Sequence, residues 1–284
     1  MKLFRTLAAA LGLVFALAAS AAQTPKDPKS PIPGLPDGRG PSGPVTLKIV
    51  APKPDELIPI PPAAAGQSPA NGAPVEVKVE LTGYETFQDP ATKAGQYVAL
   101  MLDNIPTIFA YYDVSKPWLF KKIPKGTHTL RAFPMRPWGE SIKGDSAFAS
   151  VTFSVGEKDG KNVNEAGAPI LTVTSPRGKV KGETGRVLLD FLVTGCPIAE
   201  KGTGADSCRV RYKLDTEKEV TLSKEEAVWL ENVTPGKHAW VVGITRDEKV
   251  VPGPYTLAQG SFELENPANP NAPPATLPGK ATGQ

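Results

Sequence analysis

The amino-acid sequence predicts an all-β protein of two tandem β-sandwich domains, with flexible segments at its two ends. Three observations support this fold class. Apolar residues recur at every second position in short runs, turn residues separate these runs, and one order of landmarks occurs twice along the chain. Period-2 runs are typical of strands buried on one face, and many short strands with regular turns are typical of a sandwich or barrel.

The N-terminus has the three parts of a secretory signal peptide. Lys2 and Arg5 precede an apolar run of Ala, Leu, Val and Phe, and small residues follow it. We expect cleavage after Ala21 or Ala22, which makes residues 1–22 the signal peptide and the mature chain extracytoplasmic, either periplasmic or secreted. The apolar run is shorter than the roughly 20 residues of a membrane span, and no later segment is long enough, so no membrane span is predicted. An uncleaved anchor is the alternative.

The charge of the mature chain is nearly balanced. The sequence contains 32 basic and 29 acidic residues, and removing Lys2 and Arg5 leaves a formal net charge of +1. Domains that bind nucleic acid carry a basic patch or stripe. The composition therefore predicts no nucleic-acid partner.

Proline, glycine and short polar residues mark the boundaries of the predicted domains. Residues 23–44 and 266–284 contain few large apolar side chains, so they bury too little surface to offset the entropy of ordering. We interpret the first segment as a flexible linker and the second as a disordered tail. Between them we place sandwich domains at 45–156 and 169–265, joined by a linker at 157–168.

The strand pattern is clearest in three runs. Residues 75–81 alternate strictly between apolar and polar side chains, and apolar residues share one face in the runs 187–193 and 151–155. Such alternation predicts strands with one face on the core. The nearest helical candidate is Leu222–Val228, which offers at most about two turns.

Each half of the chain presents the same landmarks in the same order. A strand running into a proline is followed by an alternating strand ending in Thr-Gly, a strand ending in Leu-Asp, an aromatic segment, a Gly-x-His turn and a closing Phe-x-Val or Phe-x-Leu. The Gly-x-His turns are Gly126–His128 and Gly236–His238. This recurrence indicates a duplicated domain.

The strand that opens each half, together with the turns KGTHTL and PGKHAW, resembles bacterial immunoglobulin-like and fibronectin type III-like domains of exported proteins. The resemblance covers residues 45–155 and 169–264. It implies sandwiches of about seven strands and roles in spacing, adhesion or ligand binding, and by itself no catalytic activity.

The two cysteines, Cys196 and Cys208, lie 12 positions apart in the second half. In an oxidising compartment, thiols this close in sequence favour a disulfide. Zinc would need further ligands, and a redox site would have C-x-x-C spacing, so neither role is predicted. Because the cysteines end one strand and begin the next, the predicted disulfide staples a loop.

His128 and His238 are the only histidines in the sequence and occupy matching positions in the repeat. A proton switch or a metal ligand is one interpretation. We favour a structural role, because each ring follows the turn at Gly126 or Gly236 on the core side of its strand. There it can hydrogen-bond loop backbone, as the tyrosine corner does in related sandwiches.

Catalytic motifs are missing from the sequence. It contains no G-x-S-x-G nucleophile elbow and no phosphate-binding glycine loop. Hydrolysis would need a serine such as Ser141 activated by a histidine, or a carboxylate pair such as Asp103 with Glu140. We therefore predict no catalytic residue, cofactor or metal, and an envelope-acting hydrolase is the least favoured function.

The best ligand-binding candidates lie around the loop between the last two strands of the first domain, in RAFPMRPWGESIK. They are Arg131, Arg136, Trp138 and Glu140. An exposed Trp138 flanked by charges could stack on a sugar ring or anchor a protein interface. The alternative, which we favour for this loop, folds Trp138 over the sandwich edge and pairs Arg131 with Glu140 on the surface.

Tyr112 is a second candidate, because the run FAYYD would present a tyrosine platform if its strand were an edge. Cross-strand core packing is the favoured alternative. Together these features predict a non-catalytic extracytoplasmic binding module. Its first domain would bind a cell-envelope glycan or protein through the Trp138 loop, and its second would be a stapled spacer. The alternative is a structural or assembly scaffold of the envelope with no small ligand.

Overall fold

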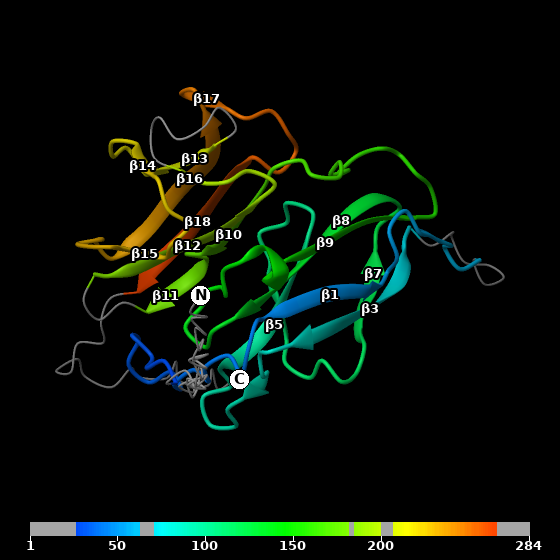
Figure 1. Ribbon diagram of the computed structural model, residues 1–284, viewed down its shortest axis with the longest axis horizontal. Coiled ribbons are helices and arrows are strands. Elements are labelled where there is room, and N and C mark those ends of the chain that lie inside the picture. Colours follow the sequence, from blue (N-terminus) through cyan, green and yellow to red (C-terminus); the bar gives the residue numbers. More distant parts are fainter. Residues whose placement is uncertain (1–26, 63–70, 182–184, 200–206, 266–284) are drawn as a thin grey trace, which may run out of the picture.

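The computed structural model describes residues 27–62, 71–181, 185–199 and 207–265 and confirms the all-β fold. These residues form β-strands and one short 3-10 helix, arranged as two sandwich domains that lie side by side (Figure 1). The predicted signal peptide and the predicted tail lie outside the described residues.

Domain 1 contains a three-stranded sheet of order β1-β3-β7 and a six-stranded sheet of order β2-β9-β8-β5-β4, in which β6 also pairs with β5. Its elements are β1 (Thr46–Ala51), β2 (Leu57–Ile58), β3 (Ala73–Thr82), β4 (Phe87–Gln88), β5 (Gly95–Leu102), β6 (Phe109–Tyr111), β7 (Trp118–Ile123), β8 (Gly126–Met135), the 3-10 helix η1 (Asp145–Ala147) and β9 (Ala149–Val155).

Domain 2 repeats this arrangement, with a three-stranded sheet of order β10-β12-β15 and a six-stranded sheet of order β11-β18-β16-β13-β14, in which β17 also pairs with β16. Its strands are β10 (Ile170–Ser175), β11 (Gly178–Lys181), β12 (Val187–Thr194), β13 (Arg209–Leu214), β14 (Val220–Leu222), β15 (Val228–Leu230), β16 (Gly236–Arg246), β17 (Lys249–Val250) and β18 (Leu257–Glu265).

Both domains cross between their sheets at the same landmark. The first strand pairs within the smaller sheet and its register shifts by one residue just before Pro52 or Pro176. After the proline, the chain adds a short parallel strand to the larger sheet, β2 on β9 and β11 on β18. Because proline donates no backbone hydrogen bond, it ends the first ladder and permits the crossing.

Alternation along the strands builds each core. In β3, Val75, Val77 and Val79 are buried while Glu76 and Lys78 between them are exposed. The nearest helical candidate, Leu222–Val228, is not a helix. It runs from the end of β14 through a loop to the start of β15, and Glu225 Oε1 accepts a hydrogen bond from the Val193 backbone N–H at 2.8 Å, which ties this loop to β12.

Strands β8 and β12 are buried on both faces. All ten residues of β8 are buried. In β12, the predicted core face is buried, and so are Leu188, Asp190 and Leu192 on the opposite face, at 4%, 0% and 2% exposed. Leu192 packs with outward-facing residues of β5 and β8 in one apolar cluster, whose buried members in domain 1 are Ala99, Met101, Phe133 and Met135. The two sandwiches therefore pack face to face, β5 and β8 of one against β12 of the other.

Two segments outside the strands lie against domain 1. In the predicted linker 23–44, residues 27–44 fold back on the domain, and Ser42 N–H donates to Gly83 O at 3.0 Å. In the linker 157–168, Thr127 N–H donates to Asp159 Oδ1 at 2.9 Å. Specific contacts with domain 1 thus position both segments.

The predicted disulfide between Cys196 and Cys208 is confirmed, with a Cα–Cα distance of 5.8 Å. It joins the end of β12 to the start of β13 and staples the loop between them.

We expect the double variant Cys196→Ala/Cys208→Ala to lower the free energy of unfolding by about 3 kcal/mol, since the disulfide restricts the unfolded chain. Urea denaturation followed by circular dichroism measures this loss. Reductant should destabilise the wild type similarly and leave the variant unchanged. Equal stability of wild type and variant would contradict the staple.

Candidate functional site

A buried guanidinium from domain 1 crosses the domain interface. Arg131 lies on the outward face of β8 and is 1% exposed. Its Nη1 donates to Leu171 O at 3.1 Å and to Thr172 Oγ1 at 3.0 Å, both in domain 2, while Nη2 donates to Asp103 O in its own domain. The guanidinium also lies 4.9 Å from the ring centroid of Tyr255.

The charge of Arg131 has no carboxylate partner within ion-pair distance in the described ranges. Burial lowers its pKa to about 10, which still leaves it charged at neutral pH. Backbone and hydroxyl oxygens instead accept hydrogen bonds from its two Nη atoms, because a buried charge needs such partners. The expected surface pair between Arg131 and Glu140 is therefore wrong.

A buried carboxylate from domain 2 makes the reciprocal contact. Asp190 on β12 is 0% exposed. Its Oδ2 accepts hydrogen bonds from Ser141 N–H at 2.9 Å and Ser141 Oγ at 2.6 Å, and its Oδ1 lies 2.7 Å from Lys143 Nζ. Thr174 of its own domain also donates to it. Each domain thus inserts one charged side chain among donors or acceptors of the other.

Two further hydrogen bonds, one from an amide and one from a guanidinium, join the domains. Asn104 Nδ2 donates to Pro254 O at 2.8 Å, and Arg177 Nη1 donates to Pro106 O at 2.8 Å. The interface thus combines the apolar cluster of β5, β8 and β12 with two fully buried charged side chains and with these further polar contacts.

The structure does not place Trp138 as an exposed ring. Trp138 is 6% exposed, its Nε1 donates to Glu140 Oε2 at 2.7 Å, and the guanidinium of Arg136 lies 5.5 Å from its ring centroid. Gly38 of the N-terminal segment packs so closely that a Cβ on it would lie 3.2 Å from Trp138 Cη2. Arg136, Trp138 and Glu140 therefore form one internal cluster, away from Arg131.

Tyr112 packs beside another tyrosine. Its ring centroid lies 5.3 Å from that of Tyr97 with the planes tilted by 59°, and its hydroxyl lies 3.4 Å from Lys93 O. Tyr97 in turn packs against the apolar cluster of the interface. The Tyr112 ring thus supports the domain contact from one side.

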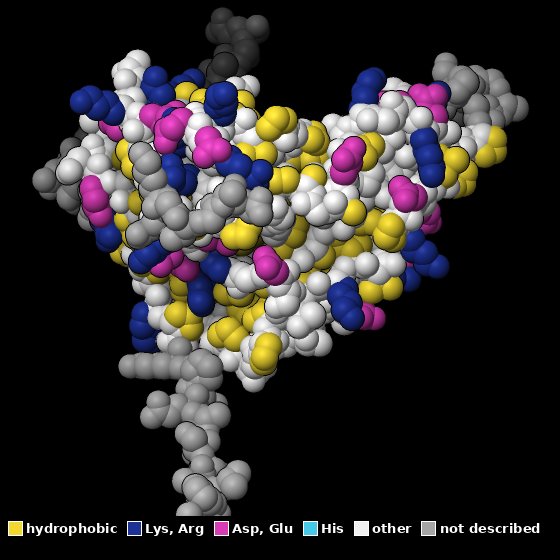
Figure 2. Space-filling model, turned by 45° about the horizontal axis from the view of Figure 1, so that its top comes forward, with side chains coloured by type: hydrophobic (Ala, Val, Ile, Leu, Met, Phe, Trp, Pro, Cys, Tyr) yellow, Lys and Arg dark blue, Asp and Glu magenta, His cyan; other side chains and the backbone are white. Residues whose placement is uncertain are grey.

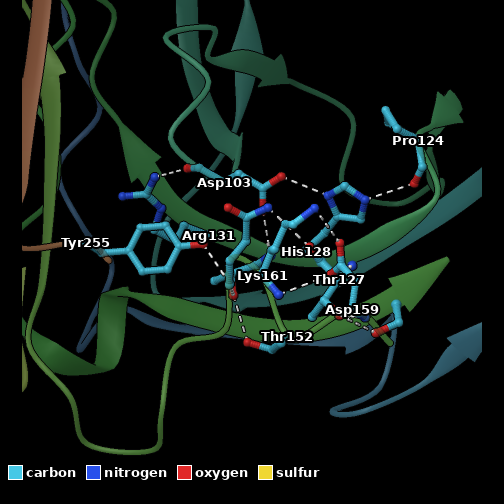
Figure 3. A network of polar contacts seen from close by, with 12 residues as sticks. Asp103, Pro124, Thr127, His128, Arg131, Thr152, Asp159, Lys161 and Tyr255 are labelled. Atoms are coloured by element: carbon cyan, nitrogen blue, oxygen red, sulfur yellow. Dashed lines mark hydrogen bonds and ion pairs between the residues drawn. The ribbon is translucent and has the colours of Figure 1, made fainter. Parts of the chain in front are cut away.

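Both histidines belong to the same structural motif, shown for domain 1 in Figure 3. His128 Nδ1 lies 2.8 Å from Asp103 Oδ2 and its Nε2 lies 2.9 Å from Pro124 O, while Thr129 N–H donates to Asp103 Oδ1 at 2.8 Å. In domain 2, the corresponding distances around His238 are 2.7 Å to Asp215 and 2.7 Å to the Thr234 carbonyl.

The turns before these histidines require glycine. Gly126 and Gly236 have φ of 129° and 132°, a region that side chains with a Cβ rarely adopt. The aspartates Asp103 and Asp215 both occupy the left-handed region, at φ 51° and 48°. Asp103 links the histidine motif to the interface, because its carboxylate binds His128 and its backbone oxygen binds Arg131 (Figure 3).

Both rings hold acceptors at both nitrogens, an arrangement that favours the protonated imidazolium. Burial alone lowers the pKa of His128, but hydrogen bonds to Asp103 and to the Pro124 carbonyl, with the charge of Asp103, outweigh it and raise the pKa. Burial also lowers the pKa of His238, but the hydrogen bonds to Asp215 and to the Thr234 carbonyl outweigh this effect and raise the pKa. With each Nε2 facing a carbonyl, neither ring is positioned to activate a serine.

The described ranges hold no group of three or more His, Cys, Asp or Glu side chains arranged for a metal ion. Among the same residues, no helix has the length and apolar character needed to span a bilayer. On the face shown in Figure 2, basic and acidic side chains are interspersed, and hydrophobic side chains lie mainly between the two lobes.

Sequence reasoning missed several residues of the interface, above all Asp190, Lys143 and Tyr255. One signal was present in the sequence. The run Val187–Val193 is apolar at six of its seven positions, Asp190 being the exception. Such a nearly continuous apolar strand indicates burial on both faces.

The chain was compared with protein families, with curated proteins and with solved structures. No protein-family model matches the sequence, and no curated protein matches it significantly. Among solved structures, the fibronectin(III)-like modules of CbhA from Clostridium thermocellum match 78% of this chain and 95% of theirs, at 12% identity and a TM-score of 0.26.

Domains D00-D0 of intimin match 76% of this chain and 98% of theirs, at 9% identity and a TM-score of 0.19. TM-scores this low carry no argument about function. The assignment to the immunoglobulin-like and fibronectin type III-like class rests on the strand order of each domain.

We expect Arg131→Ala to lower the free energy of unfolding by about 3 kcal/mol, because it leaves buried carbonyls without a donor and hydrogen bonds of a charged group are lost. It should also split the thermal unfolding of the two domains into separate transitions in differential scanning calorimetry. The matched control is Val241→Ala at the equivalent strand position of domain 2, which is 42% exposed. A single transition in Arg131→Ala with unchanged midpoint would show that the contact does not couple the domains.

We expect stability to fall as the pH rises from 6 to 9. A raised histidine pKa contributes stability that is fully present below the unfolded-state value of about 6.5 and is lost as the pH passes the folded-state value. The double variant His128→Gln/His238→Gln should show a much flatter dependence. Urea denaturation at several pH values measures both, and a wild-type stability that rises over this window would contradict the assignment.

Proposed function

We propose that the chain is a non-catalytic, extracytoplasmic scaffold in which two immunoglobulin-like domains form one rigid unit. The observation that carries this proposal is the reciprocal burial of Arg131 and Asp190 across the domain interface. Separating the domains would expose an apolar cluster and leave two charged side chains without the partners that they have in the other domain. The domain pair therefore holds a fixed geometry, as a spacer or an assembly component must.

The placement of the loop candidates supports a scaffold over a loop-based binding module. The outward faces of β5, β8 and β12 are occupied by the interface, and Trp138 is covered by the N-terminal segment. The Trp138 loop thus serves packing within the molecule. The disulfide supports an oxidising compartment, in agreement with the predicted signal peptide, and a protein of the cell envelope is the proposed partner class.

A Trp138→Ala variant separates the scaffold from a binding module. Because the ring is buried, its removal should lower the free energy of unfolding by about 3 kcal/mol. Wild type and variant, both immobilised as folded mature chain, should capture the same proteins and glycans from envelope extracts. The matched control is Leu119→Ala on β7, where the side chain is 57% exposed and neither property should change.

The opposite combination would overturn the proposal. If Trp138→Ala keeps wild-type stability and loses an envelope ligand that Leu119→Ala retains, the loop is a binding site and domain 2 is an accessory.

A further inference from the structure

A cleft of about 1020 Å³ lies where domain 1 meets the larger sheet of domain 2. Domain 1 lines it with residues at the end of β5 and in the following loop, among them Met101 and Asn104, and with Arg131 of β8. Domain 2 lines it with parts of β10, β16 and β18 and with Gly178 at the start of β11. The contacts that join the domains leave this space open.

One strand presents an unpaired edge at this cleft. Residues Leu257–Ser261 of β18 pair with β16 on one side, whereas β11 begins to pair on the other side only at Phe262. Within the part of the chain that the structure describes, no further strand pairs with β18. Such an edge offers backbone N–H and C=O groups to another extended chain.

The equivalent edge in domain 1 is faced by the chain itself. β9 pairs with β2 only at Ser154 and Val155. Beside the remainder of β9 lies a smaller cleft of about 500 Å³, whose lining includes the linker residues Val163–Gly167. Thr129 Oγ1 donates to Asn162 O at 2.6 Å and fastens this linker. Domain 1 thus has an irregular segment of chain beside the edge of β9, whereas domain 2 leaves the corresponding edge of β18 accessible.

The open cleft carries positive charge. Arg131 and Arg177 line it, and no aspartate or glutamate does. Arg177 is held by hydrogen bonds to carbonyls, including Pro106 O at 2.8 Å, and its guanidinium lies 5.8 Å from the ring centroid of Trp240. As for Arg131, no carboxylate in the described ranges lies within ion-pair distance of Arg177. Arginine favours carboxylate ligands, so an acidic group would complement this wall.

Apolar side chains complete the cleft. Val241 on β16 and Leu257 on β18 line it and are 42% and 50% exposed. An added strand would place alternate side chains on this surface, which gives specificity while the main chain gives affinity.

We propose that this cleft binds an extended, acidic segment of a partner protein, which adds as a strand beside Leu257–Ser261 and directs a carboxylate toward Arg177. The segment 266–284 of this chain suits the cleft poorly, because it contains five prolines and no acidic residue. Proline lacks the donor that a strand ladder needs. The proposal names the class of partner that the proposed scaffold would bind. It rests on the proposed function in one respect, because the cleft exists only if domain 1 is held in a fixed position beside domain 2.

The test is a titration of the ¹⁵N-labelled mature chain with two pools of acetylated, amidated hexapeptides. Both pools have Val, Ile, Thr or Ser at five positions, and the third position is Glu in one pool and Gln in the other. The Glu pool should produce saturable shifts at the amides of Leu257–Ser261, with at least tenfold weaker binding for the Gln pool. Methylating the peptide backbone nitrogens should abolish the shifts, because it removes the ladder donors.

Two protein variants test the charge. Arg177→Gln should bind the Glu pool at least tenfold more weakly and should no longer distinguish Glu from Gln. Lys179→Gln, which removes a charge of the same sign from an exposed side chain on β11 that pairs with Glu265, should bind as the wild type does.

Absence of saturable shifts at these amides, equal binding of the two pools, or equal binding of methylated peptides would overturn the proposal. Saturable shifts with a synthetic 266–284 peptide in place of the Glu pool would also overturn it, since the chain's own segment would then be the occupant. Calorimetry of the same samples keeps the two proposals apart: two transitions in the wild type refute the rigid scaffold, whereas one transition without peptide binding refutes only the cleft.

Discussion

A guanidinium removed from water must find oxygen acceptors for its N–H groups, and at Arg131 part of these acceptors belong to the other domain. This requirement fixes the position of β10 against β8. Asp190 imposes the same constraint in the opposite direction, since its donors Ser141 and Lys143 come from domain 1. The apolar cluster between the domains supplies the buried apolar surface. The two charged side chains define the relative position of the two sheets in which this surface is buried.

The two copies of the fold have kept their internal motif and changed their outer faces. Asp103 with His128 and Asp215 with His238 share the same partners and nearly the same distances. On the outer face of the second strand, by contrast, domain 1 has the charged series of β3 and domain 2 has the buried series of β12. The interface is therefore heterologous: different faces of related domains meet, and the contact is not repeated at the free face of either domain.

Sequence periodicity could predict the strands, the loop disulfide and the position of the histidines, because each of these depends on residues close together in the chain or on one face of a strand. The interface could not be derived in the same way. Arg131 resembles a surface residue in the sequence because its acceptors are backbone carbonyls and hydroxyls, which leave no distinctive pattern. Trp138 was placed in a loop correctly, but its cover is Gly38, roughly a hundred positions earlier in the chain. The apolar run around Asp190 did indicate burial on both faces. This indication is easily overlooked, because every second residue of the run also fits the pattern of a strand with one buried face.

The fastened linker has a consequence for how the molecule assembles. Its contacts to Thr127 and Thr129, and the hydrogen bond from Tyr255 to Asn162, hold the beginning of domain 2 beside the face it must cover. Tethering of this kind raises the effective concentration of the second sandwich at the first. A chain in which only the first sandwich has formed therefore exposes Phe133 and Met135 to solvent, and apolar surface exposed in a partly folded chain promotes aggregation.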